Sequence, residues 1–477
     1  MELFSPWEGK TGRLLAVTEE GGRYTLGDLY RAADRLAGAL GGRRLLFLLC
    51  ENTPGMLLSY FGCLRCGAVP LLLDAHLDPE LLEGLLTVYR PAFVAAPEDL
   101  PEGARRKLGD YAPLLRIEDA LLLGRPGETG PRLHPELALL LTTSGSTGSP
   151  KLVRLSRENI ESNTRSIVEY LGLTEDERPV TNLAMSYSYG MSILNTHLMA
   201  GAPVVLTRHS VLERAFWELV RREKVTSLAG VPYTYRMFRR VGLMEMDLPW
   251  LTTLTQAGGK LPEALHLTFA EWADRTDRRF FVMYGQTEAA PRMGYLPAEQ
   301  AVDKCGSMGV AIPGGTFRLL GEDGAELTGP GQVGELVYRG ANVAMGYAQG
   351  PEDLCLGDEW EGLLRTGDMA RRDEDGYYYI VGRKKRFLKL YGNRVNLDEV
   401  ERMLAAAWPE AEVACVGEDD LLRVFFAGGA EGLEEAMVTR LCDRLAFPPR
   451  TFQVLRLEHL PKSESGKVQY AQLAGLE

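Results

Sequence analysis

The sequence lacks a surplus of positive charge and a long apolar run, and both absences restrict its partners. Its 477 residues contain 53 Lys and Arg against 65 Asp and Glu, giving a net charge of −12. Nucleic acids and anionic membranes attract basic surfaces, so neither is an expected partner. No apolar stretch approaches the ~20 residues of a bilayer-spanning helix, and residues 1–6 lack the basic and apolar regions of a signal peptide. We therefore expect a cytoplasmic protein without a membrane span.

Cysteine and histidine are too few and too scattered to predict a metal centre. The seven cysteines lie mostly in apolar stretches, which is typical of reduced thiols. Cys63 and Cys66 have the spacing of half a metal site, but no second ligand pair lies nearby. The six histidines form no cluster, so we expect no transition-metal enzyme.

The apolar pattern predicts an α/β protein of two or three domains. Helix-period segments such as 26–40 alternate with short apolar runs, as in a layered parallel sheet. Glycine-punctuated β segments after residue 306 predict a small barrel-like part. The charged run 382–386 divides a large domain, 1–384, from a tail, 385–477, with its own α/β pattern. Asn396 is the expected start of a helix reaching Ala407, and strands are expected at 45–49, 69–73, 137–141, 180–184, 204–207, 227–229, 315–320, 334–339, 377–381, 413–416, 424–427 and 452–457.

A loop of hydroxyl residues and glycines follows the expected strand 137–141. Its residues are Thr143, Ser144, Gly145, Ser146, Thr147 and Gly148, with Pro150 and Lys151 after them. Backbone N–H groups of such a loop converge on an anion, so the loop predicts a phosphate site. It differs from the kinase-type pattern G-x-x-x-x-G-K-[ST], because no Ser or Thr follows Lys151. A flexible linker is the alternative.

The loop resembles the phosphate loop of the adenylate-forming superfamily, which includes acyl-CoA synthetases, luciferases and peptide-synthetase adenylation domains. The resemblance continues in order along nearly the whole chain, through Tyr284-Gly-Gln-Thr-Glu288, Gly334-Glu335, Thr366-Gly-Asp368, Gly382-Arg383, Gly392-Asn-Arg394 and Pro461 to Gly466-Lys467. It implies a large N-terminal domain of layered α/β subdomains with a small β-barrel-like part. A small, mobile α+β C-terminal domain would follow.

The resemblance also implies a reaction. A carboxylate attacks the α-phosphate of ATP, giving an acyl-adenylate and pyrophosphate, and the acyl group then passes to the thiol of CoA or of a carrier-protein phosphopantetheine. An amide-forming ligase and an amino-acid-activating enzyme are alternatives. A non-catalytic nucleotide-binding relative is a rival of another class, and a P-loop kinase or hydrolase is a third.

Carried over from the family, the nucleotide-binding roles fall on residues of both domains. Residues 143–148 and Lys151 would hold the departing pyrophosphate. Glu288 would bind Mg²⁺, because a hard cation prefers carboxylate oxygen. Thr287 would reach the α-phosphate. The remaining implied contacts are Tyr284, Gly258 and Gly259 with adenine, Asp368 with the ribose, and Arg383 with ribose or phosphate.

The tail carries three further implied roles. Lys467 resembles the lysine that bridges the carboxylate and the α-phosphate during adenylation. Lys385 lies at the hinge about which the family's small domain rotates, and Gly392 would line the path of the thiol. Lys384 and Arg386 could instead be simply solvated. Asn393 departs from the residue types expected after Gly392, which weakens the assignment of the acceptor.

The acid pocket is predicted to be neutral and mostly apolar. Amino-acid-activating relatives place an aspartate where this chain has Ser188, so no carboxylate would pair with an α-ammonium group. The pocket would suit an aliphatic or aromatic carboxylic acid. Its predicted residues are Tyr187, Ser188, Tyr189, Gly190, Val231, Tyr233, Met283 and Ala289. His197, further along the same helix, needs no acid–base role because the acid is already ionised at neutral pH.

Overall fold

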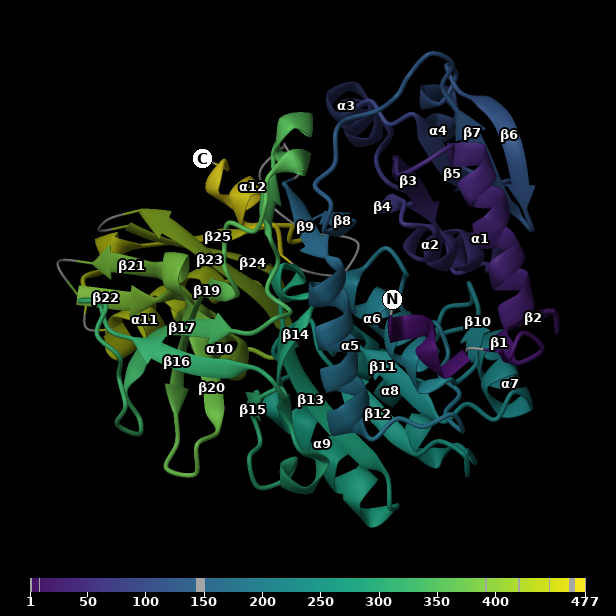
Figure 1. Ribbon diagram of the computed structural model, residues 1–477. Helices are drawn as coiled ribbons and strands as arrows, with labels where there is room; N and C mark the ends of the chain where they lie inside the picture. The colour runs from purple at the N-terminus through teal and green to yellow at the C-terminus, as the bar shows by residue number, and fades with distance from the viewer. Residues whose placement is uncertain are drawn as a thin grey trace. The chain divides into compact units, whose positions relative to one another are not determined.

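The chain forms two compact units in the computed structural model, which describes residues 2–7, 9–142, 151–390, 393–418, 421–445, 447–462 and 468–476 (Figure 1). The first unit comprises Met1–Thr143, Ser149–Phe317 and Tyr338–Leu364. The second contains Arg318–Val337 and Arg365–Glu477. The boundary predicted between residues 384 and 385 thus falls inside the second unit.

An eight-stranded sheet is the largest in the first unit, with strand order β18-β9-β8-β4-β3-β5-β7-β6. Strands β8, β4, β3 and β5 run parallel at its centre. Successive residues of β3 face opposite sides: Leu46 and Leu48 join one apolar core, Phe47 and Leu49 another. Both faces are therefore covered, as is usual for parallel strands. The bounds are β3 (Leu45–Cys50), β4 (Val69–Asp74), β5 (Phe93–Pro97), β6 (Ala112–Ile117), β7 (Ala120–Gly124), β8 (Leu137–Thr142), β9 (Leu152–Ser156) and β18 (Gly346–Ala348), with helices α1 (Leu26–Leu40), α2 (Pro54–Cys66), α3 (Pro79–Tyr89) and α4 (Glu102–Lys107).

A second sheet has five strands in the order β11-β12-β13-β14-β15. Several residues predicted to bind the nucleotide or the acid lie on its strands or directly after them. Its first three strands are parallel, and β14 returns antiparallel to β13. A three-stranded sheet, β10-β1-β2, completes the unit. The bounds are β1 (Leu14–Thr18), β2 (Arg23–Thr25), β10 (Val204–Leu206), β11 (Ser227–Gly230), β12 (Thr253–Gln256), β13 (Arg279–Gly285), β14 (Arg292–Leu296) and β15 (Val310–Ala311), with α5 (Arg157–Leu171), α6 (Ser188–Ala200), α7 (Arg214–Arg222), α8 (Pro232–Arg240) and α9 (Glu263–Arg275).

The second unit is built mainly on a four-stranded sheet, β16-β17-β19-β20, and a three-stranded sheet, β23-β24-β25. A hairpin, β21-β22, precedes α10, whose first turn is capped by Asn396. The bounds are β16 (Thr316–Leu320), β17 (Val333–Arg339), β19 (Leu363–Arg372), β20 (Tyr378–Arg383), β21 (Phe387–Leu390), β22 (Asn393–Asn396), α10 (Leu397–Ala407), β23 (Ala411–Glu418), β24 (Leu421–Gly428), α11 (Leu433–Leu445), β25 (Phe452–Arg456) and α12 (Tyr470–Ala474).

The predicted α/β class is confirmed, with 35% helix and 30% strand. The strand predicted at 180–184 is wrong, because only an isolated bridge forms there, at Val180. The reason is a side chain: Asn52 Nδ2 donates hydrogen bonds to the carbonyl oxygens of Thr181 and Leu183, at 2.8 and 3.1 Å. These carbonyls need no partner strand. Within the described residues, no helix combines the length and apolar character required to cross a bilayer.

Candidate active site

The predicted metal ligand Glu288 is oriented by a tyrosine that the sequence analysis did not identify. Glu288 lies in a short 3-10 helix, Thr287–Ala289, directly after β13. Tyr347 of β18 donates its hydroxyl proton to Glu288 Oε1 over 2.8 Å. Burial and the neighbouring Glu288 carboxylate raise the pKa of Tyr347, so the phenol remains a donor at neutral pH. Tyr347 therefore fixes one oxygen of the carboxylate, and the other oxygen accepts no hydrogen bond from any described residue.

Lys151 adds a positive charge on the same tyrosine. Its Nζ atom lies 5.1 Å from the centre of the Tyr347 ring, within the range of a cation–π contact. Trp360 packs its edge against this ring at 4.9 Å. The structure thus brings together Lys151 and Glu288, which were predicted to serve phosphate and metal, through a residue between them.

Ser188 and Thr287 meet although 99 positions separate them in the chain. Their hydroxyl oxygens lie 3.3 Å apart, Ser188 at the first turn of α6 and Thr287 beside Glu288. A residue predicted for the acid pocket and the predicted α-phosphate contact are therefore adjacent. Among the described residues, no carboxylate forms a hydrogen bond with the Ser188 side chain.

Gly258 permits a close approach of three segments. Its φ is +81°, which L side chains rarely adopt. A Cβ atom at this position would lie 2.5 Å from Tyr187 Oη and 3.0 Å from Val231 Cγ1. At Gly259, the nearest atom to a Cβ would be Pro232 Cγ, at 3.2 Å. The strip predicted to contact adenine thus lies beside two residues predicted for the acid pocket.

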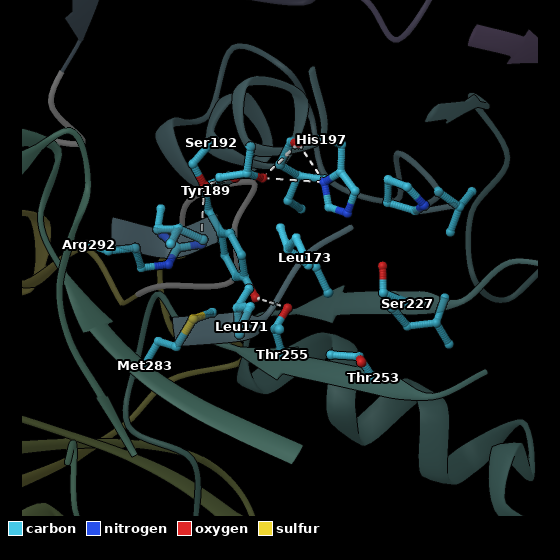
Figure 2. A pocket seen from close by; sticks show the side chains of 17 residues that line it. Leu171, Leu173, Tyr189, Ser192, His197, Ser227, Thr253, Thr255, Met283 and Arg292 are labelled. Atoms are coloured by element: carbon cyan, nitrogen blue, oxygen red, sulfur yellow. Dashed lines mark hydrogen bonds between the residues drawn. The ribbon is translucent and has the colours of Figure 1, made fainter. Parts of the chain in front are cut away.

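A mostly apolar cavity lies between α5, α6 and the strands β11 to β13 (Figure 2). The volume accessible to a water-sized molecule is about 30 Å³, enough for about two water molecules. A larger ligand could therefore enter only if side chains of the wall moved. Met283 is unbranched and adaptable in this way. The cavity is lined by Ile167, Leu171, Leu173, Pro179, Val180, Tyr189, Ser192, Ile193, Thr196, His197, Ser227, Leu228, Ala229, Thr253, Thr255, Met283 and Arg292.

Only two of the predicted pocket residues, Tyr189 and Met283, line this cavity. Tyr189 is 2% exposed and donates its hydroxyl proton to Thr255 Oγ1 over 2.8 Å. Burial raises the pKa of Tyr189 to about 12. Gly190 packs tightly against the Ala184 carbonyl and Ala289 is buried. Tyr233 is instead 48% exposed on α8, so it is not part of this wall.

His197 faces the cavity with one nitrogen unpaired. Its Nδ1 lies 2.8 Å from the Ile193 carbonyl oxygen, which can only accept, so this nitrogen carries the proton. The other ring nitrogen, Nε2, is buried without a partner among the described residues. Burial lowers the pKa of His197 to about 4. The histidine is therefore neutral near pH 7.

Arg292, a charged residue, also lines this cavity, whereas the sequence predicted a neutral, mostly apolar acid pocket. This residue begins β14 and is 3% exposed. The sequence offered one signal for it, since Arg292 is the only charged residue between Glu288 and Glu299. Helical spacing from Ser188 could likewise have suggested Ser192 and Thr196 as wall residues.

In the second unit, Asp368 and Arg383 are paired. They are direct partners in the β19–β20 ladder, and Arg383 Nε lies 2.6 Å from Asp368 Oδ1. Asp368 is 3% exposed, and its backbone N–H donates to Thr366 Oγ1 over 3.1 Å. Two residues predicted separately to bind the ribose and its phosphate therefore lie side by side.

The cations around the predicted hinge Lys385 are ion-paired rather than merely solvated. Lys384 Nζ lies 2.9 Å from Glu335 Oε2, and Arg365 pairs with the same carboxylate. Hydrogen bonds from Arg365 and then Lys384 hold the pKa of Glu335 below its usual value. Arg386 Nε lies 2.8 Å from Asp398 Oδ1 at the start of α10. Lys385 itself lies in a short 3-10 helix, Lys384–Arg386.

Several predicted residues lie outside the described part of the chain: Thr143, Ser144, Gly145, Ser146, Thr147, Gly148, Gly392 and Lys467. Where the chain is described, no group of three or more His, Cys, Asp or Glu side chains could hold a metal ion.

Comparisons with known proteins identify the family and the fold. The profile of a family described as AMP-binding enzyme matches residues 5–348. Indoleacetate–CoA ligase of Aromatoleum aromaticum is 31% identical, over 91% of this chain and 90% of the relative. Feruloyl-CoA synthase of an Amycolatopsis species is 32% identical, over 95% and 94%. The o-succinylbenzoate CoA synthetase of Bacillus subtilis, solved with its acyl-adenylate, shares the fold with a TM-score of 0.79 at 20% identity, covering 100% of this chain and 98% of that one.

Proposed function

The chain belongs to the family of AMP-binding enzymes, and from that premise we propose that it activates an aromatic carboxylic acid. It is an ATP-dependent acid–CoA ligase that forms an acyl-adenylate and passes the acyl group to CoA, with Mg²⁺ as its metal ion. The family and the reaction expected from the sequence motifs are thereby confirmed. The identity of the acid and the roles of individual residues are proposals.

The observation that carries the choice of acid is the cavity beside the Ser188–Thr287 contact. Its wall is mostly apolar; Tyr189 directly follows Ser188 in the chain, and Met283 lies four positions before Thr287. No carboxylate is among the described residues that line it, so the α-ammonium group of an amino acid would lack a partner there. The relatives named above act on acids with aromatic rings, according to their names. An aromatic acid fits both facts.

Side chains of the first unit would have separate roles in adenylation. Glu288, with one oxygen held by Tyr347, would present its free oxygen to Mg²⁺, which supplies charge neutralisation for the phosphates when bound. The adjoining hydroxyls of Ser188 and Thr287 would orient the carboxylate and the α-phosphate toward each other. Lys151 would add positive charge near the phosphates, with Tyr347 fixing its position.

The roles of the second unit stay predictions from the family motifs. Asp368 would accept hydrogen bonds from the ribose hydroxyls, and its pairing with Arg383 holds the carboxylate in place for that task. Lys467 would stabilise the transition state of adenylation. Lys385 would act as hinge and Gly392 would line the path of the thiol. A carrier-protein thiol as a second acceptor and a cytoplasmic location are also part of the proposal.

Pyrophosphate release from ATP tests the proposal directly. Aromatic, short-chain, long-chain and amino acids would be compared, each with and without CoA. We expect release with one or more aromatic acids, and an acyl-CoA product when CoA is present. Release only with amino acids would refute the interpretation of Ser188. An amide formed with an amine but no acyl-CoA would favour the amide-forming alternative. ATP binding without release for any acid would favour a non-catalytic relative.

A further inference from the structure

Arg292 presents a buried positive charge to the cavity. It is 3% exposed, and its guanidinium lies 3.9 Å from the ring centre of Tyr189 (Figure 2). One terminal nitrogen, Nη2, donates to Ser192 Oγ over 3.3 Å. Nε is buried and has no partner among the described residues. The side chain thus retains a donor that nothing in the described protein satisfies.

No counter-charge from the described residues compensates this cation. Within the described chain, Arg292 forms no ion pair, and the cavity wall contains no carboxylate. A guanidinium stays charged at any physiological pH. Burying a charge without an opposite charge is costly, and one aromatic face with the hydroxyls of Ser192 and Tyr170 offsets only part of that cost. A ligand that supplies a negative charge would offset the remaining free-energy cost of burying the Arg292 guanidinium.

The backbone of Arg292 is anchored independently of its side chain. The backbone N–H of Arg292 donates a hydrogen bond to Asn163 Oδ1 over 3.2 Å, and Asn163 Nδ2 donates to the carbonyl oxygen of Arg292 over 2.8 Å. Asn342 donates to the same oxygen over 2.9 Å. The strand would therefore hold its place with another side chain at position 292. A purely structural role does not account for an arginine here.

Helix α6 gives the distance between this charge and the reacting end of the acid. Ser188, beside Thr287, and Ser192, beside Arg292, are four positions apart on one face of the helix. Four residues correspond to a rise of about 6 Å. Arg292 therefore lies about one helical turn from the Ser188–Thr287 contact, where the proposed function places the carboxylate to be activated. A benzene ring or a short carbon chain spans such a distance.

We propose that the acid activated by this enzyme carries a second carboxylate, which Arg292 binds within the cavity. This inference rests on the proposed function and narrows its substrate to dicarboxylic acids. Nε and a terminal nitrogen of a guanidinium together match the two oxygens of a carboxylate. A monocarboxylic acid of the same skeleton would leave the buried cation unpaired.

Matched pairs of acids test the proposal. Pyrophosphate release would be measured for benzoate against the three benzenedicarboxylates, and for phenylacetate against its ring-carboxylated derivatives. The variants are Arg292→Gln, Arg292→Lys and, as a control, Arg214→Gln, an arginine of α7 whose side chain is 92% exposed. We expect the wild type to prefer the best dicarboxylate by at least about 10-fold in kcat/KM. Arg292→Gln should abolish that preference, Arg292→Lys should keep part of it, and Arg214→Gln should behave as wild type.

Direct binding separates failure of this inference from failure of the proposed function. Calorimetric titration of each dicarboxylate would be performed on the wild type and Arg292→Gln, with folding checked by circular dichroism. Equal kcat/KM for both members of every pair, or an equal loss with both in Arg292→Gln, would overturn the inference and leave the ligase intact. If no acid releases pyrophosphate, the proposed function fails; the inference fails with it unless a dicarboxylate still binds the wild type and not the variant.

Discussion

The hydroxyl of Tyr347 donates a hydrogen bond of 2.8 Å to Oε1 of Glu288, although 59 positions separate the two residues. The tyrosine comes from an edge strand of the eight-stranded sheet and the glutamate follows a strand of the five-stranded sheet. A carboxylate held in this way presents its second oxygen in one orientation. Residues that orient a metal ligand commonly matter almost as much as the ligand itself.

Tyr347→Phe should weaken the response of the enzyme to Mg²⁺. The ring and its contacts with Lys151 and Trp360 would remain, and only the hydrogen bond to Glu288 would be lost. We expect the Mg²⁺ concentration for half-maximal pyrophosphate release to rise about 10-fold. A magnesium titration at saturating ATP measures the change.

Two further variants serve as comparisons in the same magnesium titration. Tyr60→Phe removes a buried tyrosine hydrogen bond to Asn195 elsewhere in the unit and should leave the Mg²⁺ response unchanged. Glu288→Gln keeps an acceptor for Tyr347 but removes the charge, and should lower the rate by at least about 100-fold. An unaltered Mg²⁺ response in Tyr347→Phe would show that the hydrogen bond does not prepare the ligand.

Gly258→Ala should impair ATP binding more than it impairs folding. The added Cβ would lie 2.5 Å from Tyr187 Oη, and the backbone φ of +81° adds strain. We expect KM for ATP to rise about 10-fold and the free energy of unfolding to fall by about 1–2 kcal/mol. Steady-state kinetics and urea unfolding measure the two effects. Gly314→Ala is the matched control, with φ of +80° and open space around it, and should show only the loss in stability.

His197 should make the stability of the protein depend on pH. Its pKa is lowered by burial from 6.5 to about 4, so below pH ~6.5 the unfolded chain binds a proton that the folded chain does not. The contribution of His197 to the free energy of unfolding is therefore fully present above pH ~6.5. It is lost as the pH falls toward 4, and the complete loss amounts to about 3 kcal/mol. Urea unfolding at pH 7.5 and 4.5 measures the difference. In His197→Gln this difference should be smaller than in the wild type, whereas His459→Gln, at an exposed site, should leave it unchanged.

Lys467→Ala should separate the two half-reactions. In the family the two steps use different faces of the small domain, so the variant should lose at least about 100-fold in pyrophosphate release. It should largely retain thioester formation from supplied acyl-adenylate. Quenched assays of each half-reaction measure this, with Lys462→Ala, a lysine paired to Glu412, as control. Equal loss of both steps would contradict a rotating small domain.

Local patterns sufficed to predict many elements of the fold. The helix expected at 26–40 forms with those bounds, because its apolar spacing, its Thr25 cap and its terminal Gly41 are all short-range features. The helix expected after Asn396 likewise ends at Ala407. The strand expected at 180–184 failed, because the hydrogen bonds of that segment go to Asn52, 129 positions from Thr181. No local pattern contains that information.

The sequence by itself determined the family, the reaction and the order of the motif residues, since these are written in short consecutive stretches such as Tyr284 to Glu288. Only the tertiary structure shows which distant residues contact the predicted site residues. Tyr347 reaches Glu288 across 59 positions, and Arg292 reaches Ser192 across 100. Such contacts depend on how distant strands and helices pack against each other, and so a buried cation in the cavity wall became apparent only in the folded chain.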